Sequence, residues 1–158
     1  MATITPSLWF DNDLEDAIDF YRSVFPDTTV HQVHRHTEDS PGGEPGSVLA
    51  ADFELLGARF NAINGGPQFP FTEAVSFRLD CADQDEVDHY WYALLDGGVE
   101  SQCGWLKDRF GLSWQVVPRR LMELLSDPDR ERANRTMQAM LGMRRLVVSE
   151  LEGAADRV

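Results

Sequence analysis

An internal repeat constrains the fold of this sequence more than any other feature. The segment SLWFDNDLEDAIDFYRSVFPD, which begins at Ser7, resembles SFRLDCADQDEVDHYWYALLD, which begins at Ser76, at a constant offset of 69 residues. In each copy an alternating stretch is followed by an acidic turn and then by apolar residues at helical spacing. Each copy therefore predicts a strand and an amphipathic helix, with Asp13 and Asp83 supplying side-chain caps at the helix starts.

Three further strands are predicted behind each helix, because β-branched and apolar residues dominate short runs that are bounded by turn residues. In the first half these runs are 29–35, 47–55 and 58–64, and in the second half they are 99–102, 104–107 and 112–118. The sequence therefore predicts an α+β fold of two βαβββ modules.

The boundaries of the parts follow from the same pattern. We expect a single domain over residues 1–158, with a first module at about 1–64, a linker at 65–72, a second module at about 73–118 and a helical tail at 119–158. The tail is expected to form a short helix over 119–125 and a longer one from Asp129 onward. One apolar face of that longer helix, packed on its own sheet or on a partner subunit, is expected to carry Ala133, Met137, Met140, Leu141, Val148 and Leu151.

Charge and hydropathy exclude several classes of protein. The formal net charge is −13, so nucleic acid and anionic membrane surfaces are expected not to be partners. The sequence has no run of 18 apolar residues, and its beginning lacks the basic and apolar segments of a signal peptide. We therefore expect a cytoplasmic protein in which Cys81 and Cys103 are free thiols.

Four motifs resemble one known family. They are ITPSLWFDNDLEDAIDFYRSVFP, INGGPQFPFTEAVSF, QCGWLKDRFGLSWQVVP and the closing MQAMLGMRRLVVSEL, so the resemblance extends over essentially the whole chain. They resemble the PhnB-like branch, often named for demethylubiquinone methyltransferase, of the vicinal oxygen chelate superfamily, which includes glyoxalase and bleomycin-resistance proteins. This resemblance implies two modules that form a half-open mixed sheet around a pocket, in a homodimer.

The methyltransferase name does not fit the glycines of the sequence. Binding of S-adenosylmethionine normally needs a glycine-rich turn between a first strand and a helix. The glycine pairs at Gly42, Gly65 and Gly97 all lie outside the two predicted strand-to-helix turns. We therefore expect no methyltransferase activity.

The resemblance also implies where a superfamily metal would be bound. The four equivalent positions are Thr5, Asn61, Ala74 and Gln115. A divalent metal at neutral pH prefers imidazole or carboxylate ligands, and these four residues offer neither. We therefore expect no metal and no other cofactor, although a shift of the alignment at Ala74 would bring in Glu73.

Strand alternation places a set of small polar and aromatic side chains on the pocket face. These residues suit a small organic ligand, because such pockets combine apolar walls with a few orienting polar groups. The alternative for the two amides is a hydrogen bond across the sheet. The candidates for the ligand pocket are Thr5, Ser7, Trp9, Arg59, Asn61, Ser76, Arg78, Ser113 and Gln115.

The leading hypothesis is a homodimer of undefined activity that binds a small organic molecule, with no catalytic residue assigned. One alternative is a metal-dependent lyase, isomerase or dioxygenase of the same superfamily, with Glu73 as a suspected ligand. Another is a drug-sequestering protein of the bleomycin-resistance kind. His34 and His36 share a face of their predicted strand, where a surface metal site is conceivable but solvated histidines are the commoner case.

Overall fold

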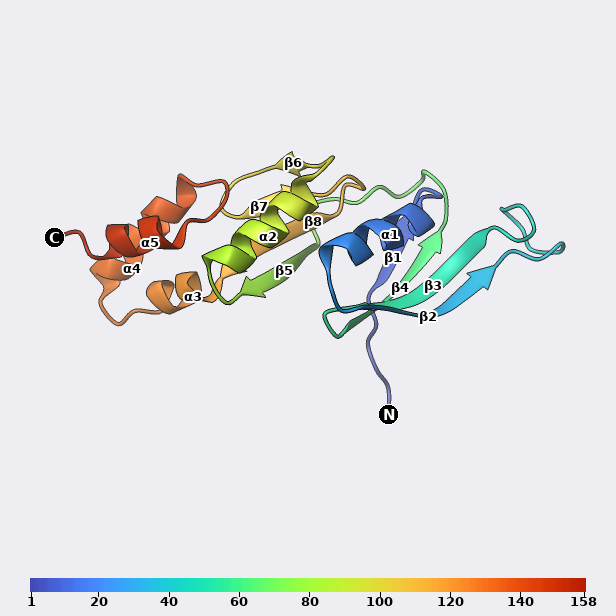
Figure 1. The fold of residues 1–158 in the computed structure, drawn as a ribbon, viewed down its shortest axis with the longest axis horizontal. Helices are drawn as coiled ribbons and strands as arrows, with labels where there is room; N and C mark the ends of the chain where they lie inside the picture. The colour runs from blue at the N-terminus through green and yellow to red at the C-terminus, as the bar shows by residue number, and fades with distance from the viewer. The chain divides into compact units, whose positions relative to one another are not determined.

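The computed structural model describes residues 1–158, which form two compact units, Met1–Phe71 and Thr72–Val158. Each unit contains its own four-stranded sheet with a helix that packs on one face (Figure 1). The predicted fold of two βαβββ modules followed by C-terminal helices is confirmed. No helix combines the length and the apolar character that a membrane crossing requires.

The first unit is a four-stranded sheet in the order β1-β4-β3-β2. Strand β1 pairs in parallel with β4, and the remaining pairs are antiparallel. Since β1 and β2 form opposite edges, the connecting helix α1 must cross the sheet. The elements of this unit are β1 (Ser7–Phe10), α1 (Leu14–Val24), β2 (Thr28–Arg35), β3 (Val48–Leu55) and β4 (Ala58–Asn64).

The core of the first unit lies between α1 and one face of this sheet. The apolar side of α1 buries Leu14, Ala17, Ile18, Tyr21 and Val24. The sheet contributes the alternate, inward-facing residues of its strands, as the period of two requires. These buried strand residues are Leu8, Phe10, Ala51, Phe53, Leu55, Phe60 and Ala62. The alternate residues between them, such as Ser7, Trp9, Asp52, Asn61 and Ile63, therefore face away from α1, onto a face that no helix of this unit covers.

The second unit repeats this arrangement, with the strand order β5-β8-β7-β6 and a parallel pair between β5 and β8. Helix α2 buries Val87, Trp91 and Leu94 on the sheet. The elements of the module are β5 (Ser76–Cys81), α2 (Gln84–Leu95), β6 (Val99–Glu100), β7 (Trp105–Lys107) and β8 (Ser113–Pro118).

Three helices follow β8: α3 (Arg119–Leu125), α4 (Arg130–Leu141) and α5 (Val148–Ala155). The expectation of one apolar face running from Ala133 to Leu151 is wrong, because the chain leaves the helix at Gly142 and starts a new one at Val148. Met137 and Leu141 are 37% and 50% exposed. The buried cluster is formed instead by Val117, Leu121, Leu124, Leu146, Leu151 and Ala155.

The two helix starts are capped differently. Asp83 caps α2 as predicted, because its side chain accepts a hydrogen bond from the Glu86 N–H. The expectation that Asp13 caps α1 is wrong, since its side chain makes no capping bond. The Leu14 N–H donates instead to Asn64 Oδ1 at 3.0 Å. A residue from the end of β4 therefore provides the acceptor for one of the free N–H groups at the start of the helix.

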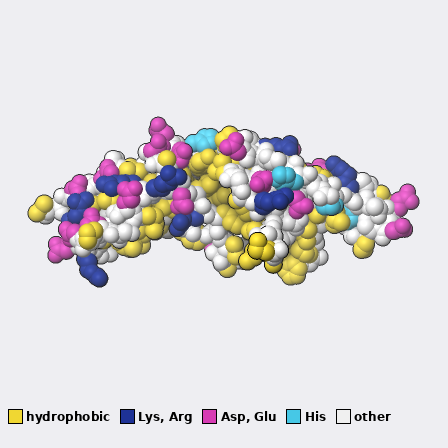
Figure 2. All heavy atoms as spheres, turned by 90° about the horizontal axis from the view of Figure 1, so that it is seen from below, with side chains coloured by type: hydrophobic (Ala, Val, Ile, Leu, Met, Phe, Trp, Pro, Cys, Tyr) yellow, Lys and Arg dark blue, Asp and Glu magenta, His cyan; other side chains and the backbone are white.

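The surface mixes charges of both signs. Figure 2 shows acidic side chains interspersed with lysines and arginines in this view, and several form ion pairs, such as Arg120 with Glu152. Most of these pairs are solvent-exposed, so each contributes less than about 1 kcal/mol to stability.

One carboxylate is buried in the second unit. Asp108 is only 3% exposed and lies in the turn before β8, which Gly111 closes with a φ of 85°. Its oxygens accept hydrogen bonds from Trp114 Nε1 at 2.9 Å and from the backbone N–H groups of Phe110 and Leu112 at 2.9 and 3.1 Å. The side chain therefore links the turn to the core tryptophan.

We expect Asp108→Ala to lower the free energy of unfolding by about 3 kcal/mol, because it leaves several buried donors without an acceptor. The matched control is Asp96→Ala, which removes an exposed partner of Arg109 and should cost less than about 1 kcal/mol. Urea unfolding followed by tryptophan fluorescence measures both. Equal losses in the two variants would contradict this role of Asp108.

Candidate functional site

The helix-free face of the first sheet carries a hydrogen-bonded row of side chains from three adjacent strands. Ser7 lies opposite Asn61, and Asn61 lies opposite Asp52. Ser7 Oγ donates to Asn61 Oδ1 at 2.9 Å, and Asn61 Nδ2 donates to Asp52 Oδ1 at 2.9 Å. Both ends of the Asn61 amide are therefore engaged within the protein, and the row ends on a carboxylate that can accept further hydrogen bonds.

Trp9 lies one row further along the same face, opposite Ile63. Its indole Nε1 donates to the Gly66 carbonyl at 2.9 Å. Its ring makes an edge-to-face contact with the Phe69 ring, with the two ring centroids 4.9 Å apart. A Cβ at Gly65 would overlap the indole ring, so the approach of the linker to Trp9 requires glycine there. The linker therefore holds the indole in place beside the hydrogen-bonded row.

Two carboxylates on this sheet, Asp52 and Glu54, were missed by the sequence analysis. Glu54, which shares a face with Asp52, forms an ion pair with His31 of the edge strand β2. Arg59 lies opposite Glu54 and is exposed. The register that brings His31 to Glu54 includes a bulge between Val30 and Gln32, and nothing in the local sequence marks that bulge.

The second sheet repeats the contact between a hydroxyl and an amide. Gln115 Nε2 donates to Ser76 Oγ at 2.8 Å. The register differs from that of the first sheet, since Ser76 lies opposite Ser113, whereas Ser7 lies opposite Asn61. Ser113 is only 1% exposed, and its hydroxyl has no hydrogen-bond partner. The longer Gln115 side chain bridges the two-residue difference.

The cations of this second sheet are paired. Arg78 Nε lies 2.9 Å from Asp80 Oδ1, and Lys107, which is opposite Ser113, contacts Glu73. The Lys107 ammonium group lowers the pKa of the exposed Glu73 carboxyl, chiefly through the hydrogen bond between them. Glu73, which the sequence analysis named as an alternative metal ligand, thus forms an ion pair with Lys107.

The remaining two positions implied by the resemblance lie outside the strands. Thr5 precedes β1 and Ala74 precedes β5, and both residues are exposed. Strand alternation therefore does not apply to them. Nowhere in the chain do three or more His, Cys, Asp or Glu side chains form a group that could hold a metal ion. The four positions offer two engaged amides, a hydroxyl and a methyl group, a set that does not fit a divalent metal.

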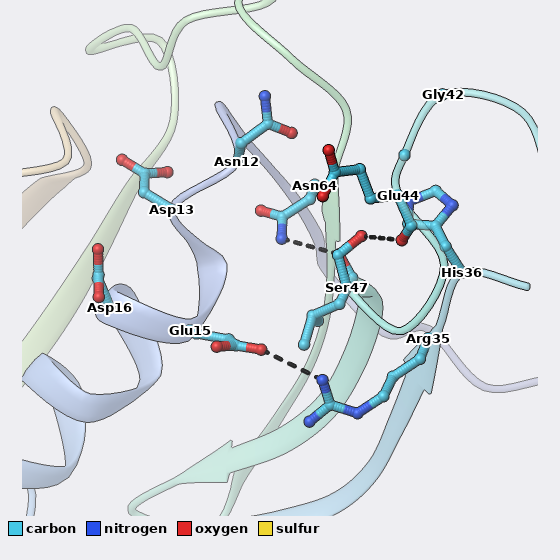
Figure 3. A pocket seen from close by; sticks show the side chains of 12 residues that line it. Asn12, Asp13, Glu15, Asp16, Arg35, His36, Gly42, Glu44, Ser47 and Asn64 are labelled. Carbon is cyan, nitrogen blue, oxygen red and sulfur yellow. Dashed lines mark hydrogen bonds and ion pairs between the residues drawn. The ribbon is translucent and has the colours of Figure 1, made fainter.

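A separate pocket of about 630 Å³ lies at the start of α1, beneath the loop between β2 and β3 (Figure 3). The sequence analysis missed it, because its walls come from three segments that are distant in the sequence. These walls are Asn12, Asp13, Glu15 and Asp16 from the start of α1, Arg35, His36, Gly42, Gly43, Glu44, Ser47 and Val48 from the loop and its flanks, and Asn64 from β4.

His36 forms part of this pocket and not of the strand. The expectation that it shares a strand face with His34 is wrong, because the register shifts between His34 and Arg35 and β2 ends at Arg35. His36 is only 7% exposed. Its backbone N–H donates to the Ser47 carbonyl at 2.8 Å and its carbonyl accepts from Gly46 at 2.8 Å, which closes the base of the loop.

The carboxylates of the pocket influence one another. Burial raises the pKa of the Asp13 carboxyl above its usual value, and the neighbouring Asp11 and Asp16 raise it further. Asp13 Oδ1 is buried without a hydrogen-bond partner. Arg35 Nη1 donates to the Gly46 carbonyl at 2.9 Å and lies 3.6 Å from Glu15 (Figure 3). The pocket therefore contains more negative than positive charge.

Paired βαβββ modules in which the first strand lies parallel to the last define a glyoxalase-type fold, that of the vicinal oxygen chelate superfamily. The family described as 3-demethylubiquinone-9 3-methyltransferase matches residues 2–117. The chain belongs to this PhnB-like family. Because the match ends at residue 117, helices α3 to α5 fall outside it, and the expected resemblance over the whole chain is too broad.

Solved structures agree with this assignment. The PhnB protein from Bacillus cereus is 31% identical, with a TM-score of 0.67, over 74% of this chain and 99% of that chain. Protein PA1353 from Pseudomonas aeruginosa is 21% identical, with a TM-score of 0.60, over 75% of this chain and 98% of its own. The fosfomycin resistance protein FosX from Listeria monocytogenes is 16% identical, with a TM-score of 0.57, over 80% of this chain and 98% of its own. The last two show the fold alone, and no curated protein matches the chain.

We expect the two free cysteines to differ in reactivity. Burial and the nearby Glu86 and Asp80 carboxylates raise the pKa of the Cys81 thiol to about 12, so its reactive thiolate is scarce at neutral pH. Treatment of the folded protein with iodoacetamide at about pH 8 should modify Cys103, which is half-buried, and leave Cys81 intact until the protein is unfolded. Mass spectrometry measures the modification. Rapid labelling of a folded Cys103→Ser variant would contradict the expected protection of Cys81.

Proposed function

We propose that this PhnB-like protein binds a small organic molecule at the serine and amide pair of a sheet, on the face opposite α1 or α2, without a catalytic metal. The observation that carries the proposal is the bonding of Asn61 and Gln115. Each amide is held by a serine of the neighbouring strand, Ser7 or Ser76, at 2.8–2.9 Å. Amides fixed in this way are oriented to recognise polar groups of a ligand at little entropic cost.

The character of the faces supports an organic ligand. On the first sheet, the indole of Trp9 and the side chain of Ile63 provide apolar surface beside the Asp52 carboxylate. On the second sheet, Trp105 lies opposite Gln115 and has the same role. Apolar walls with a few oriented polar groups are typical of small-molecule sites.

The methyltransferase activity in the family description is not part of the proposal. A strand-to-helix turn that binds S-adenosylmethionine needs glycine for the close approach of the backbone. The turn between β1 and α1 is Asp-Asn-Asp at 11–13, and the turn between β5 and α2 is Ala-Asp at 82–83. Neither turn contains a glycine.

The experiment is native mass spectrometry of the unheated, tag-free protein, with spectra recorded before and after denaturation. We expect an organic adduct that denaturation releases, or one gained from a panel of aromatic and carboxylate compounds offered at about 1 mM. Asn61→Ala and Gln115→Ala should each lower the occupancy of that ligand about fivefold, which corresponds to the loss of one hydrogen bond. Asn134→Ala, at an exposed position of α4, is the matched control and should leave the occupancy unchanged.

Two results would contradict the proposal. One is a single tightly held divalent ion per chain that Gln115→Ala abolishes. The other is the absence of any adduct or gained ligand in both the wild type and the variants.

We propose further that the protein is a cytoplasmic homodimer. The exposed Met122, Met137 and Leu141 on α3 and α4 support the association, and the free Cys81 and Cys103 support a reducing compartment. The native spectra report the subunit number directly. A monomer at micromolar concentration would contradict the dimer.

A further inference from the structure

We propose that the pocket at the start of α1 is a second binding site, for a small organic cation with an alkylammonium group. It lies apart from the helix-free face of the same sheet, because α1 packs on the opposite face. Its volume of about 630 Å³ falls within the range of small-molecule sites. The proposal rests on which hydrogen-bonding groups of its walls are used within the protein and which are not.

The buried imidazole of His36 presents an unused acceptor. The Ser40 hydroxyl donates to the Thr37 carbonyl at 2.9 Å and accepts from the Thr37 N–H at 2.7 Å. Since its hydrogen is already used, Ser40 Oγ acts as an acceptor toward His36 Nδ1, which lies 3.2 Å away. The neutral imidazole therefore carries its hydrogen on Nδ1, and its Nε2 bears a lone pair. The His36 residue is 93% buried, and its side-chain hydrogen bond is made by Nδ1 and not by Nε2.

Three carboxylates of the pocket are acceptors as well. Asp13 Oδ1 is buried without a partner, and the carboxylates of Asp16 and Glu44 line the same space (Figure 3). Such an arrangement needs hydrogen-bond donors and positive charge from outside the protein.

Two donors of the walls, in contrast, are engaged. Asn64 Nδ2 donates to the Val48 carbonyl at 3.0 Å, and the Ser47 hydroxyl donates to the Glu44 carbonyl at 2.6 Å. Arg35 is held by the Gly46 carbonyl and Glu15. Carboxylates outnumber cations in the walls, and the charge of −13 on the whole chain favours the approach of a cation.

The geometry favours an ammonium group over a bare metal ion. The carboxylates and the imidazole do not form a group of three or more that could coordinate one ion. An alkylammonium, with three donors and an apolar stem, can reach separated acceptors across a pocket of this size.

The experiment is a calorimetric titration of the protein with 1,4-diaminobutane at about pH 8, where the diamine is charged and an ordinary imidazole is neutral. Uncharged 1,4-butanediol is the matched ligand control. We expect saturable binding of the diamine with a stoichiometry of one per chain, and no binding of the diol. In parallel, the ¹⁵N signal of His36 Nε2 should shift in NMR spectra as the diamine is added, since this atom accepts one of its donors.

Matched variants separate the pocket from the general acidity of the chain. Asp16→Asn and Glu44→Gln should each weaken diamine binding about fivefold, and Gly43→Ala should weaken it at least as much, because a Cβ there would overlap the His36 ring. Asp85→Asn removes the equivalent charge from the first turn of α2 and should have no effect.

Three results would overturn the proposal: no saturable diamine binding, equal binding of the diol, or the same loss in Asp85→Asn as in Asp16→Asn. Because the variants of the sheet faces, Asn61→Ala and Gln115→Ala, do not touch this pocket, they should bind the diamine normally. Failure of the sheet-face proposal is therefore distinguishable from failure of this one.

Discussion

In each half of the chain the first strand of the module pairs in parallel with the last, as β1 does with β4 and β5 with β8. Parallel neighbours cannot be joined by a tight turn, so the intervening chain must cross the sheet, and the helix provides that crossing. Because the helix buries one face, the other face is left for polar side chains. The hydrogen-bonded serine and amide pairs, Ser7 with Asn61 and Ser76 with Gln115, lie across this parallel pairing.

The two copies of this arrangement have diverged in chemistry. In the first sheet the row continues from the amide to the Asp52 carboxylate, with the Glu54 carboxylate on the same face. In the second sheet the corresponding region contains two cations, Arg78 and Lys107, each paired with an acid. The two sheets therefore differ in the groups beside their amides: a carboxylate ends the row of the first sheet, and the second sheet carries two paired cations.

Much of the fold was predictable, because the strands and helices follow local periodicities. The predicted runs 29–35 and 58–64 agree with β2 and β4 to within one residue. Contacts that depend on strand register were not predictable: Asp52 reaches Asn61, and His31 reaches Glu54, only across neighbouring strands. The pocket at the start of α1 (Figure 3) was missed for a similar reason, since the loop between β2 and β3 brings His36 to the start of α1.

We propose that the Asn61 and Gln115 amides, each hydrogen-bonded to a serine, contact an organic ligand and do not coordinate a metal. The most direct measurement follows their side-chain NH₂ signals by NMR while Mn²⁺ is added, because a bound paramagnetic ion broadens the signals of its ligands. We expect that neither signal broadens selectively up to one equivalent of Mn²⁺. Selective broadening of both at one equivalent would contradict it.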